Sequence, residues 1–258
     1  MSLFSLNRLI NVLHLRSEFG YHFPQSSQTE RGGMVRNTAH SLGLQTKCPW
    51  TTSCFDMFFR LTLEVYSPAI LDFLTNALTS AELDARQLAS CMYGLQSFKD
   101  ADPHVLRLVD ALAMITGKFP DVNFTAQAVS NMLYGLQGLS SDSPEVRRLL
   151  SSLASLLAGV DGMGESGRIL SAQGVGNALY GLQGLKSDCQ ELRELIQRLQ
   201  PLVASATLDG QAIGNALYGL QSMKSEVPEV QRLLEALAEK VTAFEGKLTE
   251  QVTWLHKV

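Results

Sequence analysis

The chain has 258 residues, which is enough for one or two domains with a buried core. Apolar residues make up 45% of it and charged residues 18%, which excludes a largely disordered polypeptide. The formal net charge of −4 gives no general attraction for nucleic acid, and polar residues interrupt every apolar stretch before it reaches the length of a membrane-spanning helix.

Residues 1–66 form a region of different character at the start of the chain. Met1–Arg16 holds two arginines, no acidic residue and an amphipathic spread of Leu, Phe and Ile. This pattern resembles a mitochondrial-type transit peptide, and an ordinary disordered N-terminus is the alternative. Ser, Gln, Gly and Thr clusters between Tyr21 and Trp50 predict a linker. We therefore expect a poorly ordered segment and an intracellular protein, in a mitochondrion, a plastid or the cytoplasm.

One motif then recurs four times, with a tyrosine at its centre. The four copies are RQLASCMYGLQ, QAVSNMLYGLQ, QGVGNALYGLQ and QAIGNALYGLQ, and their tyrosines, 41, 46 and 38 residues apart, are Tyr93, Tyr134, Tyr180 and Tyr218. Units of 38–46 residues suit two helices and two short turns. The sequence predicts an all-α fold, an α-solenoid of about four helix-pair repeats, with nine or ten helices from residue 67 onward and no β-sheet.

The second helix of each unit is expected after a turn that contains capping residues. Asp102 and Ser143 each precede a proline at the first helical position, and Val227 precedes Pro228 without an ideal cap. Leucine and valine then recur with helical spacing. Pro201 should kink or end the second helix of the third unit.

The limits of the array follow from the same alignment. Residues 68–84 resemble a second helix without its first helix, and the Gly-rich residues 159–168 predict a surface loop. Gln251 lies 40 residues after Gln211, where a fifth unit should open. We expect the helical array to cover residues 67–247, and residues 248–258 to be a truncated fifth repeat or a cap.

A helical wheel of the third motif divides its residues into three sets. The predicted core set is Val175, Ala178, Leu179, Leu182 and Leu185, and Leu136 and Leu220 should be buried like Leu182. Gly174, Ala178 and Gly181 form a strip of small residues. Two glycines in a helix interior cost about 1 kcal/mol each relative to alanine, so close helix packing or an open backbone surface for a ligand must explain them.

The remaining face carries polar and aromatic side chains in every unit. Stacked units would align these residues into a ladder, for which the candidate ligand-binding residues are Tyr93, Asn131, Tyr134, Gln137, Asn177, Tyr180, Gln183, Asn215, Tyr218 and Gln221. Amides can read base edges and tyrosines can stack on bases, as in helical repeats that bind single-stranded RNA. The same amides can hold an extended peptide, or can bond between units as structural groups.

Three arginines lie 14 residues after their tyrosines: Arg107, Arg148 and Arg232. They form either a weak phosphate-contact stripe or a solvated ion-pair face with neighbouring Glu145 and Glu229. The four cysteines, Cys48, Cys54, Cys91 and Cys189, have irregular spacing and no nearby histidine pair, so we expect reduced thiols and no metal site.

The segment QAIGNALYGLQSMK, residues 211–224, resembles the opening helix of octotricopeptide repeats, in which Gln, Asn and a Leu-Trp-Ala-Leu element have this spacing. Helical repeats of FAST-kinase-like and RAP-domain proteins are similar. The resemblance covers roughly residues 65–258. It implies an organellar RNA-binding factor that acts in transcript processing, stability or translation.

Enzyme motifs are absent from the sequence: it has no phosphate-binding glycine loop, no HExxH and no GxSxG. We expect a non-catalytic binding scaffold without cofactor, metal or membrane insertion. Its first candidate partner is single-stranded RNA, and its second is an extended peptide or protein bound in the manner of armadillo or tetratricopeptide repeats. The oligomeric state stays open.

Overall fold

A computed structural model of the chain describes residues 68–79, 81–119, 124–158 and 170–244. The described part is all-helical, with nine α-helices and no strand. This confirms the predicted all-α class and the predicted number of helices for these residues. The expectations for the N-terminal segment, the loop at residues 159–168 and residues 248–258 lie outside the described residues.

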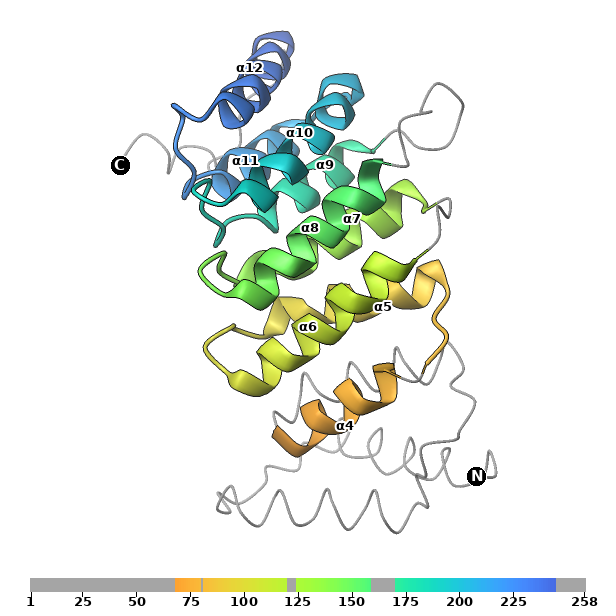
Figure 1. The fold of residues 1–258 in the computed structure, drawn as a ribbon. Coiled ribbons are helices and arrows are strands. Elements are labelled where there is room, and N and C mark those ends of the chain that lie inside the picture. Colours follow the sequence, from red (N-terminus) through yellow and green to blue (C-terminus); the bar gives the residue numbers. More distant parts are fainter. Residues whose placement is uncertain (1–67, 80, 120–123, 159–169, 245–258) are drawn as a thin grey trace, which may run out of the picture.

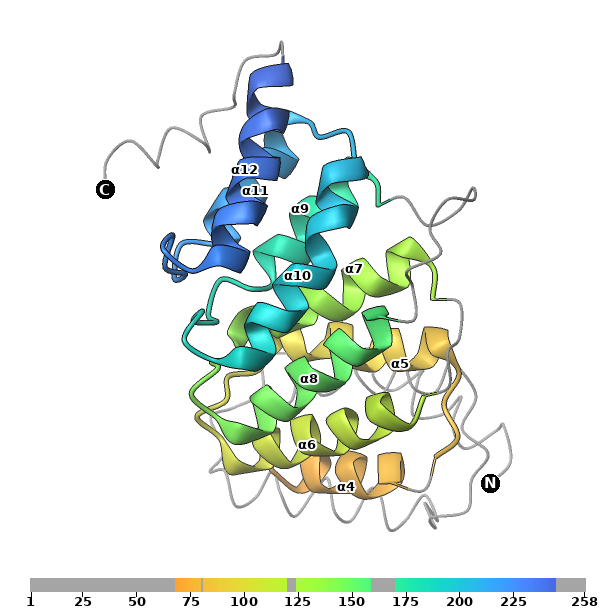
Figure 2. The same ribbon diagram turned by 45° about the horizontal axis from the view of Figure 1, so that its top comes forward.

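The helices lie in two layers (Figures 1 and 2). The motif layer consists of α5 (Ala85–Gly94), α7 (Ala126–Tyr134), α9 (Ala172–Tyr180) and α11 (Gly210–Gly219). The second layer consists of α4 (Pro68–Thr79), α6 (Pro103–Lys118), α8 (Pro144–Ala158), α10 (Gln190–Ser205) and α12 (Pro228–Ala243). Each helix packs against the next helix of its own layer, so units 1 to 4 are α5–α6, α7–α8, α9–α10 and α11–α12, and α4 precedes them in the second layer.

The motif helices begin at side-chain caps that the repeat alignment did not include. Asp84, Thr125, Ser171 and Asp209 each accept a hydrogen bond from the backbone N–H three residues later. The helices end at or just after the tyrosine, where the Gly-Leu-Gln segment tightens into a 3₁₀ turn in units 1 and 2. Each motif helix is therefore short, and its polar face stops close to the tyrosine.

Two expectations for the second helices need correction. Of the two outcomes expected at Pro201, a kink or an end of the helix, the end is wrong, because α10 continues to Ser205. Pro201 lies on the exposed side in the last turns, where water can hydrate the carbonyl of Gln197, which loses its helical partner. Among the described residues, no backbone N–H of α8 is found to donate to the Ser143 hydroxyl, which itself donates to Asp100 at 2.9 Å. Asp102 does cap α6, since it accepts from the His104 N–H at 2.7 Å.

The core lies between the layers, and the predicted core face of the third unit is confirmed. Val175, Ala178, Leu179, Leu182 and Leu185 are at most 1% exposed. Leu136 and Leu220 are also buried, which confirms the helical phase in the neighbouring units. Within the described part no helix is long and apolar enough to cross a membrane. Cys91 and Cys189 are buried, and neither forms a disulfide bond.

Candidate binding surface

The motif glycine explains how closely the units approach one another. A Cβ atom on Gly135 would overlap the carbonyl oxygen of Met92 in the preceding unit. Gly181 and Gly219 face the carbonyls of Leu133 and Leu179 in the same way. The backbone of each motif helix therefore rests on the end of the preceding one. Close helix packing, and not an open backbone surface for a ligand, therefore explains the glycine that follows the tyrosine in units 2 to 4.

This close approach brings the four tyrosines into one continuous stack. The ring centroids of Tyr93 and Tyr134 are 5.6 Å apart, those of Tyr134 and Tyr180 5.9 Å, and those of Tyr180 and Tyr218 5.4 Å. The rings lie within 21° of parallel, so each inner ring is covered on both faces by its neighbours. The ring faces of Tyr134 and Tyr180 are consequently closed to a base or any other flat ligand.

The edge of the stack is open to solvent. The outermost rings, Tyr93 and Tyr218, are 41% and 45% exposed, and the two inner tyrosines are half-buried. Among the described residues, no hydrogen-bond partner is found for the four tyrosine hydroxyls or for the side-chain amides of Asn131, Asn177 and Asn215. These donors and acceptors are therefore available to a ligand. We call this surface, made of the ten candidate residues named above, the ladder face.

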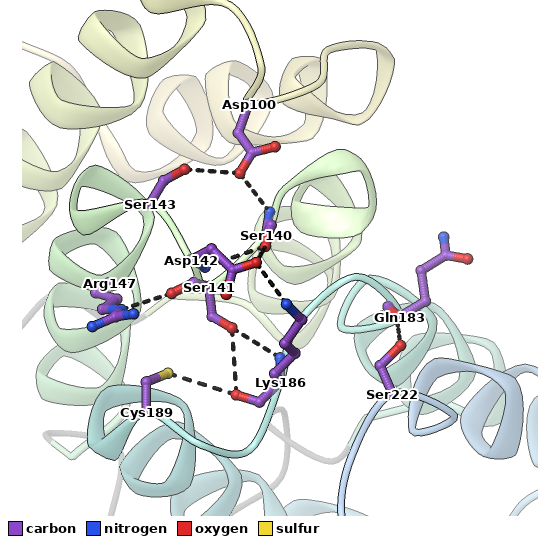
Figure 3. A network of polar contacts seen from close by, with 10 residues as sticks. All are labelled: Asp100, Ser140, Ser141, Asp142, Ser143, Arg147, Gln183, Lys186, Cys189 and Ser222. Atoms are coloured by element: carbon purple, nitrogen blue, oxygen red, sulfur yellow. Dashed lines mark hydrogen bonds and ion pairs between the residues drawn. The ribbon is translucent and has the colours of Figure 1, made fainter.

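The glutamines of the ladder face are less uniform than the asparagines. The Gln137 amide donates to the backbone carbonyl of Tyr134 at 3.4 Å, within its own turn. Gln183 receives a bond from the Ser222 hydroxyl on its backbone oxygen, at 2.8 Å (Figure 3). Gln221 is exposed. The asparagines, one in each of units 2 to 4, thus give the most regular polar set on this face.

Charge is nearly absent from the motif helices. Arg86 is the one charged residue in the sequences of α5, α7, α9 and α11. The ladder face therefore offers hydrogen bonds and ring edges, but almost no attraction for an anion.

The candidate arginines lie in the second layer, away from the motif helices. Arg107 donates to Asp72 of α4 at 2.7 Å, and Arg148 donates to Asp110 of α6 at 2.7 Å. The Asp110 carboxylate raises the pKa of Arg148. Arg232 lies 3.6 Å from Glu229. Each guanidinium thus has a carboxylate beside it. Because all three arginines lie in second-layer helices, the structure does not bring them together with the tyrosines of the motif layer.

The turns between the two helices of a unit hold a network that the sequence analysis missed (Figure 3). Ser141 accepts from the Lys186 backbone N–H at 2.9 Å, and Ser187 accepts in the same way from Lys224. Asp142 pairs with the Lys186 ammonium at 2.6 Å, and Asp188 with that of Lys224 at 2.6 Å. The signal lay in the alignment, where Ser-Asp, Ser-Asp and Ser-Glu occupy equivalent places after the tyrosine.

The titration of this network follows from its ion pairs. Hydrogen bonds from Lys186 and then from Ser140 lower the pKa of Asp142, and the bond to Asp142 raises the pKa of Lys186. No cluster of potential metal ligands occurs in the parts of the chain for which coordinates are described. Comparison with known proteins matches no family model, no curated protein and no solved structure.

Proposed function

We propose that this chain is a non-catalytic helical-repeat scaffold, an α-solenoid, whose ladder face binds an extended polypeptide segment. The observation that carries the proposal is the row of unpartnered asparagine amides beside the edge of the tyrosine stack. An amide side chain holds both a donor and an acceptor, so it can pair with the N–H and the C=O of one residue in an extended backbone. One such amide in each of units 2 to 4 gives a regularly spaced set of hydrogen-bonding groups, which suits a polymer with a uniform backbone.

Two features favour a polypeptide over RNA, which the sequence put first. Bases gain about 1–3 kcal/mol each from stacking on aromatic faces, but the inner tyrosine faces are occupied by other tyrosines. Neutralisation of phosphates needs Lys or Arg, and the motif helices carry Arg86 alone. An uncharged, hydrogen-bonding surface therefore fits a peptide backbone better than a polyanion.

Single-stranded RNA remains a second candidate because of one observation. In units 2 to 4 a glutamine and an asparagine lie at positions i and i+4 of each motif helix, as Gln173 and Asn177 do. Two side chains per unit are what helical repeats use to read one base by its edge. The resemblance to octotricopeptide repeats points to the same ligand and to an organellar setting. Such binding would depend on base edges and not on stacking.

The test presents both ligand classes to the full chain. Probes are an unbiased array of 15-residue peptides and a pool of single-stranded RNA, each at two salt concentrations. The variant replaces Asn131, Asn177 and Asn215 with Ala. Since a hydrogen bond contributes about 0.5–1.5 kcal/mol, the loss of three should weaken peptide binding at least tenfold. The fold should persist, because these amides have no partner to lose within the described residues.

The matched control replaces Arg107 and Arg148 with Ala in the second layer. Peptide binding should survive this change, because these arginines do not lie on the ladder face. RNA binding that falls with the three asparagines would establish the second candidate instead. The absence of any binding partner in both pools, or binding that is indifferent to the asparagines, would contradict a binding role for the ladder face.

A further inference from the structure

Each unit presents a different side to the unit after it and to the unit before it. We call these the forward and the backward side. Between units 3 and 4, the forward side gives Gly176, the Leu179 carbonyl and the Ser187 hydroxyl. The backward side gives Ala212, whose Cα atom lies 2.9 Å from a Cβ built on Gly176, together with Gly219 and the turn at Lys224. The interface is therefore directional, with unlike halves.

The forward side of unit 4 carries glycine and apolar residues in the corresponding places, but no described element covers it. In unit 3 the apolar residues of this side are at most 1% exposed; they are Leu179, Leu185, Ile196 and Val203. Their counterparts in unit 4, all partly exposed, are Leu217, Met223, Leu234 and Val241. Val241 is 36% exposed, and Tyr218, which stacks on Tyr180, is 45% exposed. We call this surface, made of Leu217, Tyr218, Met223, Leu234 and Val241, the end face; both α11 and α12 contribute to it.

Charge gives the end face a polarity. Between units, carboxylates of the forward side meet cations of the backward side: Asp142 meets Lys186, and Asp110 meets Arg148. The residues at the corresponding places in unit 4 are Glu226 and Glu235. Both are exposed. The end face is thus apolar with two carboxylates. It is complementary to the backward sides of units 3 and 4, whose turns carry Lys186 and Lys224.

We propose that this end face docks a helical repeat of the same type, carried by a separate polypeptide whose turn presents Lys or Arg. Continuity with three interfaces of the same kind within the chain determines the geometry. The incoming unit would place a flat side chain on Tyr218, a glycine over the Leu217 carbonyl and its cation beside Glu226. This docking does not depend on what the ladder face binds.

Two other occupants fit less well. In the register that aligns Gln251 with Gln211, the chain's own His256 and Lys257 fall at the positions of Ala216 and Leu217, which are apolar. A second copy of the chain cannot dock its first unit in register, because its α4 already lies against α6, where α12 of the receiving copy would have to lie. Two end faces meeting each other would bring their carboxylates together, which is unfavourable.

The experiment uses the full chain and a fluorescent synthetic peptide with the sequence of residues 206–244. The peptide carries L234E, which prevents its forward side from binding further copies. Fluorescence anisotropy should show saturable binding. Gly219→Leu in the peptide should weaken it at least tenfold, because the close approach is then blocked. Lys224→Glu in the peptide should weaken it about two- to fivefold, the effect of one exposed ion pair.

A charge exchange supplies the specific control. Full chain with Glu226→Lys should bind the Lys224→Glu peptide as well as the unaltered pair binds, which a merely hydrophobic contact would not reproduce. Failure of the peptide to bind, or failure of the charge exchange to restore binding, overturns the proposal. Peptide binding that occurs only after Val252→Glu and Leu255→Glu are introduced into the chain would also overturn the proposal. The chain's own C-terminal segment would then be the occupant of the end face. Dimerisation of the chain that Leu217→Glu abolishes would assign it to a second copy.

Discussion

At the scale of single residues, glycine decides whether the units can approach. Gly181 has no room for a Cβ atom, which would overlap the Leu133 carbonyl. We expect Gly181→Ala to lower the free energy of unfolding by about 1–3 kcal/mol, as overpacking does. Gly117→Ala is the control, since a Cβ there lies 3.4 Å from Ser152 Oγ. Gly117→Ala should raise the free energy of unfolding by about 0.5–1 kcal/mol, because alanine favours a helix more than glycine does. Equal effects in urea titrations would contradict this role of Gly181.

Leu182 tests the phase of the motif helix. It is 0% exposed and belongs to the core that joins both layers. We expect Leu182→Ala to destabilise the protein by about 2–5 kcal/mol, because the lost contacts leave a cavity. Chemical denaturation measures the change. A loss below about 1 kcal/mol would show that the site collapses around the smaller side chain.

The Asp142–Lys186 pair predicts a dependence of stability on pH. The pKa of Asp142 is lowered in the folded protein, so its contribution to stability is present above the ordinary carboxyl pKa of 3.8. It is lost as the pH falls through the lower, folded value. Asp142→Asn should therefore reduce stability at neutral pH and flatten its decline in acid. Because the pair is exposed, high salt should reduce the difference between the two proteins.

At the scale of elements, the tyrosine stack joins four motif helices. Tyr180 contacts a ring on both sides, whereas Tyr93 contacts a described ring only on the side of Tyr134. An aromatic pair contributes about 0.5–1.5 kcal/mol beyond its buried area. Tyr180→Leu should therefore cost about twice as much stability as Tyr93→Leu, and should reduce the near-ultraviolet circular dichroism of the stack more. A larger loss from Tyr93→Leu would mean that the stack is not the main contribution of these rings.

At the scale of the whole molecule, stability should vary along the array. Among the described helices, the extensive contacts between units join neighbouring units, so the last described unit has such an interface with a described unit on one side alone. Amide hydrogen exchange should therefore be faster in α11 and α12 than in α9 and α10. The docking peptide of residues 206–244 should slow exchange in α11 and α12 selectively. Uniform exchange across units 2 to 4 would indicate that the array opens only as one cooperative body.

The sequence by itself determined the helical class, the unit boundaries and the phase of each motif helix. These features are local or periodic: a repeat of tyrosines fixes the register of four units, and the 3.6-residue period fixes which leucines are buried. The same reasoning identified the ladder residues as one set. It could not distinguish open ring faces from covered ones, because a helical wheel contains no neighbouring unit.

Only the tertiary structure decided how the units meet. The glycines after Tyr134, Tyr180 and Tyr218 bring the backbones so close that the rings stack on one another, and this stacking covers both faces of the two inner rings. Two of the three arginines that the spacing aligned into a stripe, Arg107 and Arg148, pair with carboxylates of the preceding helix in their layer. Both outcomes depend on contacts between residues about 40 positions apart, and such contacts arise from packing between units that no local pattern specifies.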